Sequence, residues 1–176
     1  MKTNIALIGF MAAGKTAVAR QLAQRLDKKL VELDALIEQR AGKTVARIFA
    51  EDGETAFREW EIALIKEVAV ARNQVIATGG GIVLNTINVD RLRQGGVIVY
   101  LEASPTAILK RAQASTAVRP LLAGEDKAGI IEKMLRFRQP YYDRAADIRL
   151  DTSAIAVNAV AGRIIELLKQ YEDFTP

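Results

Sequence analysis

One segment of the sequence has the residue types and spacing of a phosphate-binding loop. Gly9-Phe10-Met11-Ala12-Ala13-Gly14-Lys15-Thr16 fits the pattern G-x-x-x-x-G-K-[ST] at every fixed position. In such a loop the backbone N–H groups converge on phosphate oxygens, and the dipole of the following helix favours their negative charge. We therefore expect contacts to a bound nucleotide from six consecutive residues: Ala12, Ala13, Gly14, Lys15, Thr16 and Ala17.

Two side chains of this loop have chemical roles of their own. Lys15 neutralises charge on the β- and γ-phosphates of a nucleotide, and the hydroxyl of Thr16 is a ligand for Mg²⁺. The motif stands between an apolar strand-like run and an amphipathic helical pattern, as a phosphate loop must. The alternative is an ordinary turn that fits by chance, which average residue frequencies allow in about one such chain in a hundred. The sequence therefore predicts nucleotide binding.

Asp34 is a candidate for the acceptor side of a transfer reaction. It follows a strand-like run, and ligands of open α/β sheets collect at the carboxyl ends of the strands. A carboxylate there can accept or orient the proton of an attacking hydroxyl. The alternative is that Asp34 only caps a helix that starts at Ala35.

A charged cluster follows in a long helical pattern. Glu54, Arg58 and Glu61 fall on one helix face, so Glu61 can hold Arg58 in place. A guanidinium held in this way suits the carboxylate of a substrate. The alternative is a solvated ladder of ion pairs on an exposed helix.

Glycines and further arginines complete the set of candidates. Gly79-Gly80-Gly81 follows another strand-like run and can bring bare backbone N–H groups close to a phosphate or a substrate, unless it is only a flexible turn. Arg119, beside Pro120 in an irregular stretch, can close over a transferring phosphoryl group. Arg136 and Arg138 lie near the end of a helical pattern. For each of these arginines the alternative is an ordinary surface position.

The composition excludes several other chemistries. The 176 residues include no cysteine and no histidine, which rules out disulfides, thiolate catalysis and Ser-His-Asp triads. A general base must then be Asp, Glu, Lys or Tyr, and a bound metal must be a hard cation such as Mg²⁺ among oxygen ligands.

The formal charge of +4 includes no dense basic run, so we expect no nucleic-acid partner. No apolar run approaches the ~20 residues that span a bilayer, and the first residues predict no signal peptide. We expect no membrane association and a cytoplasmic protein.

The elements that must position these residues alternate along the chain. Short apolar runs predict five strands, at residues 5–8, 30–33, 75–77, 97–101 and 148–150. Helical patterns lie at residues 18–26, 34–40, 53–71, 126–145 and 157–168. Continuous apolar strands separated by helices are typical of a parallel sheet covered on both faces. We therefore expect a single α/β domain over residues 1–176, with three layers, a central five-stranded parallel sheet and a mobile lid at about 113–124.

Taken together, these residues resemble the shikimate kinase family of small P-loop kinases, which are related to nucleoside monophosphate kinases. The resemblance runs from Ile5 to about Leu168. It rests on segments that occur in the order of the family: residues 9–16, Glu32-Leu33-Asp34, 48–61, Gly79-Gly80-Gly81, Arg119-Pro120-Leu121-Leu122, and Arg138 through Pro140 to Tyr142.

The resemblance implies roles for the residues on the acceptor side, in a substrate-binding region at about 33–61. Asp34 would contact the ring hydroxyls of shikimate and is the candidate base. Arg58 and Arg138 would clamp the carboxylate of shikimate. Gly80 and Gly81 would lie beside the substrate and the γ-phosphate.

On the nucleotide side, the resemblance implies that Arg119 comes from the lid onto the phosphates and that Arg111 lies near the adenine. Lys15, Asp34 and Arg119 are then the catalytic residues. The family uses ATP and Mg²⁺ to convert shikimate into shikimate 3-phosphate, in chorismate and aromatic amino acid biosynthesis. We expect the same reaction from a monomer.

Three positions depart from the family pattern. Glu32 stands where Asp is usual, and its longer side chain could still reach Mg²⁺ through water. Ala17 follows Thr16 where a second hydroxyl residue is common, which removes one contact to the α-phosphate. Residues 154–157 lack an arginine that is often found near the adenine, so we expect no nucleotide contact there.

Two other functions stay open at this point. A related kinase of gluconate or of a nucleoside monophosphate would use Arg58 and Arg138 to clamp a different anion. A P-loop protein that binds nucleotide without turnover would be a regulator, and Glu32 is the one feature that favours it.

Overall fold

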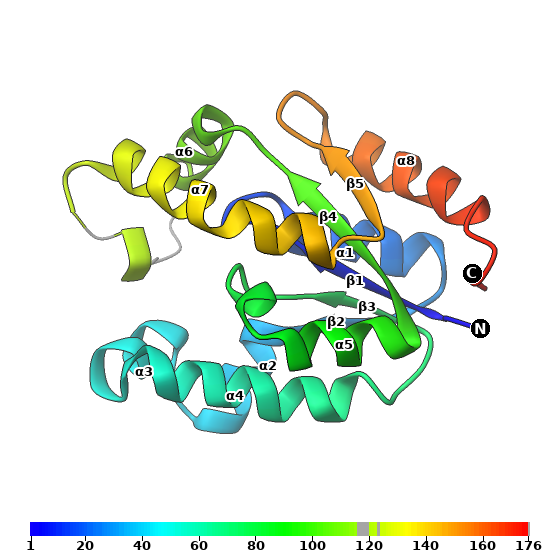
Figure 1. The fold of residues 1–176 in the computed structure, drawn as a ribbon, viewed down its shortest axis with the longest axis horizontal. Coiled ribbons are helices and arrows are strands. Elements are labelled where there is room, and N and C mark those ends of the chain that lie inside the picture. Colours follow the sequence, from blue (N-terminus) through cyan, green and yellow to red (C-terminus); the bar gives the residue numbers. More distant parts are fainter. Residues whose placement is uncertain (116–119, 123, 176) are drawn as a thin grey trace.

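The structure is a computed structural model that describes residues 1–115, 120–122 and 124–175. In this part of the chain the strands form one sheet: β1 (Asn4–Ile8), β2 (Lys29–Glu32), β3 (Gln74–Ala77), β4 (Gly96–Glu102) and β5 (Ile148–Asp151). Their order is β2-β3-β1-β4-β5, and every pairing is parallel. The predicted five-stranded parallel sheet is confirmed (Figure 1).

The described residues contain α-helices and two short 3₁₀ turns between and after the strands. The α-helices are α1 (Lys15–Arg25), α2 (Leu33–Ala41), α3 (Val45–Glu51), α4 (Gly53–Val68), α5 (Thr86–Gly95), α6 (Pro105–Gln113), α7 (Lys127–Ala145) and α8 (Val157–Lys169). The 3₁₀ turns are η1 (Ile82–Leu84) and η2 (Pro120–Leu122). None of these helices is both long enough and apolar enough to cross a membrane.

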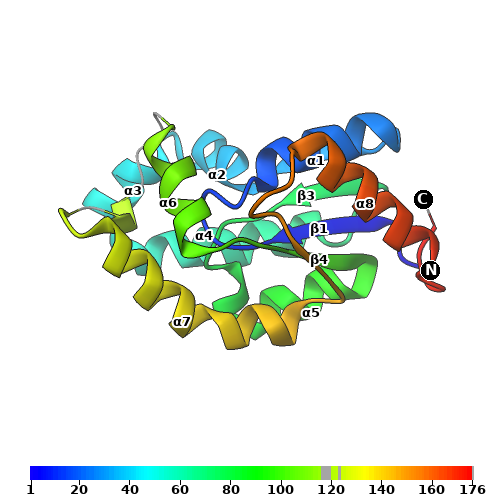
Figure 2. The same cartoon turned by 90° about the horizontal axis from the view of Figure 1, so that it is seen from above.

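The helices cover both faces of the sheet because neighbouring strand residues point to opposite sides. Ile5 and Leu7 of β1 pack in one core with α1 and α8. Ala6 and Ile8 pack in a second core with α4, α5 and the end of α7. Figure 2 shows the sheet between these two layers.

The central position of β1 decides where the phosphate loop lies. Leu7 pairs with Ala77 of β3 on one side and with Val99 of β4 on the other. Because these strands are parallel, the segments that follow β1, β2 and β3 all begin at the same edge of the sheet, where ligands of open α/β sheets bind. The sequence predicts candidate residues in all three of these segments.

Three helices were not predicted from the sequence. α3, α5 and α6 each begin after a residue whose side chain accepts a hydrogen bond from a backbone N–H in the first turn: Thr44, Asn85 and Ser104. Two predicted boundaries were also wrong. Leu33 begins α2 and does not end the second strand, and the helix that starts at Gly53 ends at Val68.

Candidate active site

A cavity of about 320 Å³ at the carboxyl edge of the sheet brings most of the predicted residues together. Its walls come from the phosphate loop, from α2, α3, α4 and α7, from the glycine loop after β3 and from η2. The lining residues are Met11, Ala12, Lys15, Thr16, Asp34, Val45, Phe49, Phe57, Arg58, Thr78, Gly79, Gly80, Gly81, Pro120, Leu121 and Arg138. Two larger hollows, of about 600 and 460 Å³, are lined by other residues and none from the phosphate loop.

The phosphate loop has the backbone conformation that its glycines permit. Gly9 and Gly14 have φ angles of 148° and 96°, and a Cβ on Gly9 would stand 2.5 Å from the carbonyl oxygen of Leu101. The Nζ of Lys15 donates to the carbonyl oxygens of Gly9 and Phe10, at 2.8 and 2.9 Å. These bonds hold the lysine at the N-terminal end of α1, where an anion is favoured.

Asp34 lies in the first turn of α2 and lines the cavity opposite the phosphate loop. The helix begins at Leu33 with Glu32 as its N-cap residue, so the alternative that Asp34 is the cap of a helix starting at Ala35 was wrong. Asp34 is exposed where it faces the cavity, but the chain around it removes part of its hydration, and this desolvation raises its pKa. The positive charge of Lys15 opposes this shift. A carboxylate with a raised pKa is better suited to take a proton than an ordinary aspartate.

The predicted charged cluster on α4 is present, and one end of it is buried. The Nη1 of Arg58 donates to Oε2 of Glu61 at 2.7 Å, and its Nη2 donates to Oε1 of Glu54 at 2.7 Å. Glu54 is half exposed, whereas the side chain of Glu61 is only 1% exposed. The cluster is therefore not a solvated ladder along an exposed helix. It holds the guanidinium of Arg58 at the wall of the cavity.

Arg138 reaches the same cavity from α7. Its side chain is buried, and its guanidinium lies 5.7 Å from the ring centroid of Phe10 in the phosphate loop. Arg136, on the same helix, is exposed and lines a different hollow. The cavity thus has two arginines, from α4 and α7, facing a lysine and an aspartate.

The glycine loop after β3 lies between these arginines. A Cβ on Gly81 would collide with the guanidinium of Arg58, and a Cβ on Gly80 would stand 3.2 Å from the backbone nitrogen of Met11 and 3.6 Å from Nη1 of Arg138. The loop is therefore packed against side chains and backbone from three directions, unlike a flexible turn. Glycine is required here because the backbone itself approaches the site.

A second, more apolar cavity of about 380 Å³ lies on the other side of the phosphate loop. Arg111 lines it, and its Nη1 donates to the carbonyl oxygen of Ala13 at 3.3 Å. Ile155, Ala156 and Val157 form the opposite wall. From the sequence we expect no nucleotide contact at this segment, because it lacks an arginine. Ile155 and Val157 are large apolar side chains that stay 40% and 38% exposed.

The predicted lid arginine, Arg119, lies outside the described residues, although Pro120 and Leu121 next to it line the first cavity. Glu32, considered above as a route to Mg²⁺ through water, pairs with Arg20 on α1: Nε and Nη2 of Arg20 each lie 2.8 Å from Oε1 of Glu32. Among the described residues, Glu32 is not part of the cavity lining.

The phosphate loop follows the central strand and faces a cavity lined by charged side chains. This arrangement defines an ATP-dependent P-loop kinase of small molecules. A model of one such family, "Shikimate kinase", matches residues 11–169. The chain therefore belongs to the shikimate kinase family.

Individual relatives agree with this assignment over nearly the full length. The shikimate kinase of Moorella thermoacetica is 46% identical over 171 residues, which cover 97% of each chain. The shikimate kinase of Symbiobacterium thermophilum is 43% identical over 168 residues, covering 95% of this chain and 97% of the relative. The solved structure of a shikimate kinase from Acinetobacter baumannii in complex with shikimate has a TM-score of 0.93 at 33% identity, covering 98% of this chain and 96% of that one.

Proposed function

We propose that this chain transfers the γ-phosphate of ATP to the 3-hydroxyl of shikimate and releases shikimate 3-phosphate and ADP. The observation that carries the proposal is the shared cavity in which Lys15 of the phosphate loop faces Asp34, Arg58 and Arg138. A phosphate donor and a carboxylate-bearing acceptor can meet in this cavity. The complex of the Acinetobacter baumannii relative with shikimate agrees with this choice of acceptor.

In the proposed mechanism the two arginines bind the carboxylate of shikimate. Arg58 is fixed by Glu61 and Arg138 by its buried position on α7, so little side-chain freedom is lost when the substrate binds. Asp34 accepts the hydrogen bond of the 3-hydroxyl and takes its proton as that oxygen forms a bond to the γ-phosphorus. The bond from the γ-phosphorus to the bridging oxygen breaks, and the electron pair leaves with ADP.

Lys15 and the backbone N–H groups of residues 12–17 bind the phosphates and stabilise the charge that moves between them. Arg119 adds a further positive charge from the lid, at about residues 113–124. The adenine lies in the apolar cavity between Arg111 and the segment 155–157, whose lining suits a flat, weakly polar ring. The backbone of Gly80 and Gly81 contacts the substrate beside the γ-phosphate.

The residues present also fit Mg²⁺. Mg²⁺ keeps several waters and needs few protein ligands when phosphates are present. The described residues contain no cluster of three or more Asp or Glu side chains that could hold a metal by themselves. The hydroxyl of Thr16, exposed at the start of α1 and lining the cavity, is a suitable single ligand. The bound ion would neutralise charge on the β- and γ-phosphates.

A panel of acceptors tests the proposal. ADP release in the presence of Mg-ATP is measured with shikimate, gluconate, AMP and CMP as separate acceptors. We expect turnover with shikimate alone. Turnover with another acceptor and none with shikimate would reject the substrate, whereas ATP binding without any acceptor-dependent ADP release would indicate a regulator. Size-exclusion chromatography with light scattering tests whether the chain is a monomer, as proposed.

A further inference from the structure

The helix α7 reaches the candidate active site with two residues spaced by one turn. Arg138 and Tyr142 are four positions apart, so their side chains lie on the same helix face. Both are buried, with exposed fractions of 4% and 0%. Arg138 lines the cavity itself, whereas Tyr142 lies behind the glycine loop that forms the wall of the cavity.

The hydroxyl of Tyr142 donates a hydrogen bond of 2.5 Å to the carbonyl oxygen of Gly80. The two neighbouring carbonyls have local partners: that of Gly79 accepts from the N–H of Ile82, and that of Gly81 accepts from the N–H of Leu84. The carbonyl of Gly80 instead turns out of the loop, toward α7. The short distance and the complete burial of Tyr142 make this a strong and well-defined contact.

The contact controls the direction of a backbone N–H group. A trans peptide unit is planar, and its carbonyl and its N–H point in opposite directions. When the carbonyl of Gly80 points to Tyr142, the N–H of Gly81 must therefore point away from α7. Glycine provides no side-chain restraint on this peptide, so the hydrogen bond from Tyr142 restricts a unit that would otherwise rotate easily.

We propose that Tyr142 is a positioning residue of the active site, which holds the Gly80–Gly81 peptide so that the N–H of Gly81 faces the acceptor. Gly80 also packs against the backbone nitrogen of Met11, so the same peptide sets the distance between the acceptor and the phosphate loop. This inference rests on the proposed function, since the acceptor is the substrate of that reaction. Tyr142 acts through the Gly80 carbonyl and does not touch the reacting atoms. Its hydroxyl also interacts with the side chain of Arg138, so a change at the Gly80 carbonyl is what distinguishes the two routes.

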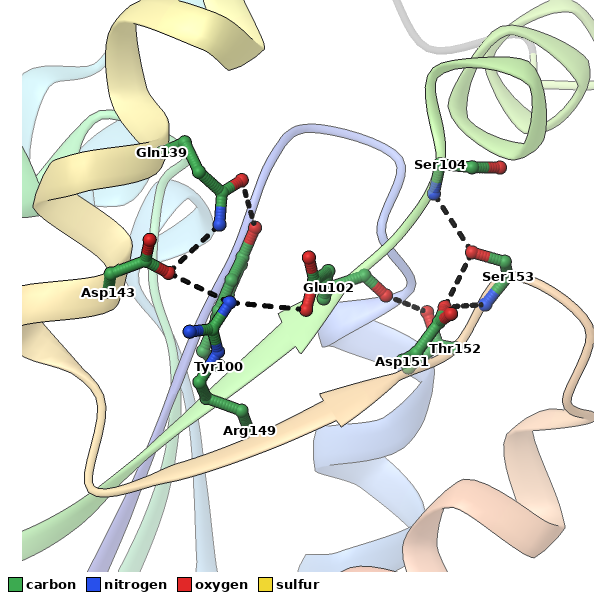
Figure 3. A network of polar contacts seen from close by, with 9 residues as sticks. All are labelled: Tyr100, Glu102, Ser104, Gln139, Asp143, Arg149, Asp151, Thr152 and Ser153. Atoms are coloured by element: carbon green, nitrogen blue, oxygen red, sulfur yellow. Dashed lines mark hydrogen bonds and ion pairs between the residues drawn. The ribbon is translucent and has the colours of Figure 1, made fainter.

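Tyr100 provides a matched control within the same pair of rings. Tyr100 and Tyr142 stack with ring centroids 4.8 Å apart and an interplanar angle of 12°. Tyr100 is also buried, and its hydroxyl bonds to Oε1 of Gln139 at 3.2 Å. Figure 3 shows that this bond belongs to a network through Gln139, Asp143 and Arg149, none of which lines the proposed substrate cavity.

The first test compares Tyr142→Phe and Tyr100→Phe with the wild-type enzyme. Each variant loses one buried hydroxyl and keeps the stacked ring, so we expect similar small decreases in melting temperature. For Tyr142→Phe, kcat/KM for shikimate should fall about tenfold while KM for ATP stays within about twofold. For Tyr100→Phe both constants should stay at wild-type values. Equal losses in the two variants, or no loss in Tyr142→Phe, would contradict the inference.

The second test needs no substrate and uses the glycine pairs of the chain. Only Gly79-Gly80, Gly80-Gly81 and Gly95-Gly96 are consecutive, so a chain labelled with [1-¹³C, ¹⁵N]glycine gives three one-bond carbonyl-to-amide signals by NMR. The signal of the Gly81 amide reports the carbonyl carbon of Gly80. In Tyr142→Phe the chemical shift of this carbonyl carbon should move upfield, because loss of a hydrogen bond shields the carbon. The chemical shift of the Gly95 carbonyl carbon should stay unchanged. In Tyr100→Phe the chemical shifts of the Gly80 and Gly95 carbonyl carbons should not move by a comparable amount.

The two tests separate the two proposals. If the wild-type enzyme does not phosphorylate shikimate but the Gly80 carbon moves in Tyr142→Phe, the proposed function fails and Tyr142 still positions the peptide. If the wild-type enzyme phosphorylates shikimate and the Gly80 carbon does not move, the positioning role is wrong and the proposed function stands.

Discussion

The Nη1 atom of Arg58 lies 2.7 Å from Oε2 of Glu61, and the other carboxylate oxygen of Glu61 has no hydrogen-bond partner within the part of the chain that the structure describes. That second oxygen faces the glycine loop, where a Cβ on Gly79 would stand 2.6 Å from it. Burial raises the pKa of Glu61 to about 7, against the opposing charge of Arg58. The residue that fixes Arg58 therefore changes its charge near neutral pH.

This raised pKa predicts a stability that depends on pH. Between about pH 4.5 and pH 7 the folded state keeps a proton on Glu61 that the unfolded state has lost, so the free energy of unfolding decreases as the pH rises. The decrease is on the order of 3 kcal/mol over this range and ends above about pH 7. Asp34, whose pKa is also raised, contributes with the same sign.

Urea unfolding at several pH values between 4.5 and 8 measures this dependence in wild type and in Glu61→Gln. The amide has no charge to lose, so we expect a flatter profile for the variant. Glu59→Gln, an exposed position on the same helix, is the control and should keep the wild-type profile. Parallel profiles for wild type and Glu61→Gln would show that Glu61 titrates as an ordinary carboxylate.

Arg58→Ala should weaken the binding of shikimate. The variant loses a charge-assisted contact worth about 1.5–3 kcal/mol, so kcat/KM for shikimate should fall by roughly one to two decades, while KM for ATP changes little. Arg47→Ala is a matched control, because Arg47 also pairs with a glutamate about one helical turn away but lies on the exposed side of α3. Shikimate kinetics at the wild-type level in Arg58→Ala would remove Arg58 from the clamp.

Gly81→Ala should disturb the clamp from the opposite side. The φ angle of Gly81 is −99°, which alanine adopts without strain, but the new Cβ would collide with the guanidinium of Arg58. We expect KM for shikimate to rise about tenfold or more, with the fold retained.

Gly162→Ala, inside α8, is the control for this variant, because the new Cβ meets only Nη1 of Arg25 at 3.5 Å. This control should raise stability by up to about 1 kcal/mol and leave the steady-state constants unchanged. Equal kinetics in the two variants would contradict the predicted packing of Arg58 on Gly81.

The parts of the site that the sequence predicted well are those whose signal is local. The phosphate loop is eight consecutive residues with a fixed pattern, and the Arg58–Glu61 pair follows from helix spacing alone. The burial of Glu61 could not be predicted in the same way, because i+3 spacing is the same on a buried and on an exposed helix face. It depends on the glycine loop after β3, the next element along the chain, which meets Glu61 only when the chain folds.

Other features depend on long-range packing or on weaker local signals. The strand order could not be predicted, because the composition of five short strands does not specify their neighbours. The hydrogen bond from Tyr142 to Gly80 joins residues 62 positions apart. By contrast, α6 could have been predicted, since Ser104-Pro105 is a typical helix start, with a capping serine and proline in the first turn.

Lys15→Ala should abolish phosphate transfer and leave the fold intact. Removal of the Nζ group takes away the positive charge on the β- and γ-phosphates, so turnover should fall below about one per cent of wild type. Lys28→Ala is a matched control: Lys28 is also buried, and its Nζ donates to the carbonyl oxygen of Thr3 and to Asn73 at the opposite edge of the sheet. This control should lose stability and keep turnover per folded molecule. The checks are ADP release for turnover, and circular dichroism with thermal melting for the fold. Lys15 would have no part in the chemistry if Lys15→Ala, folded as judged by circular dichroism, turned over shikimate at the rate of the control.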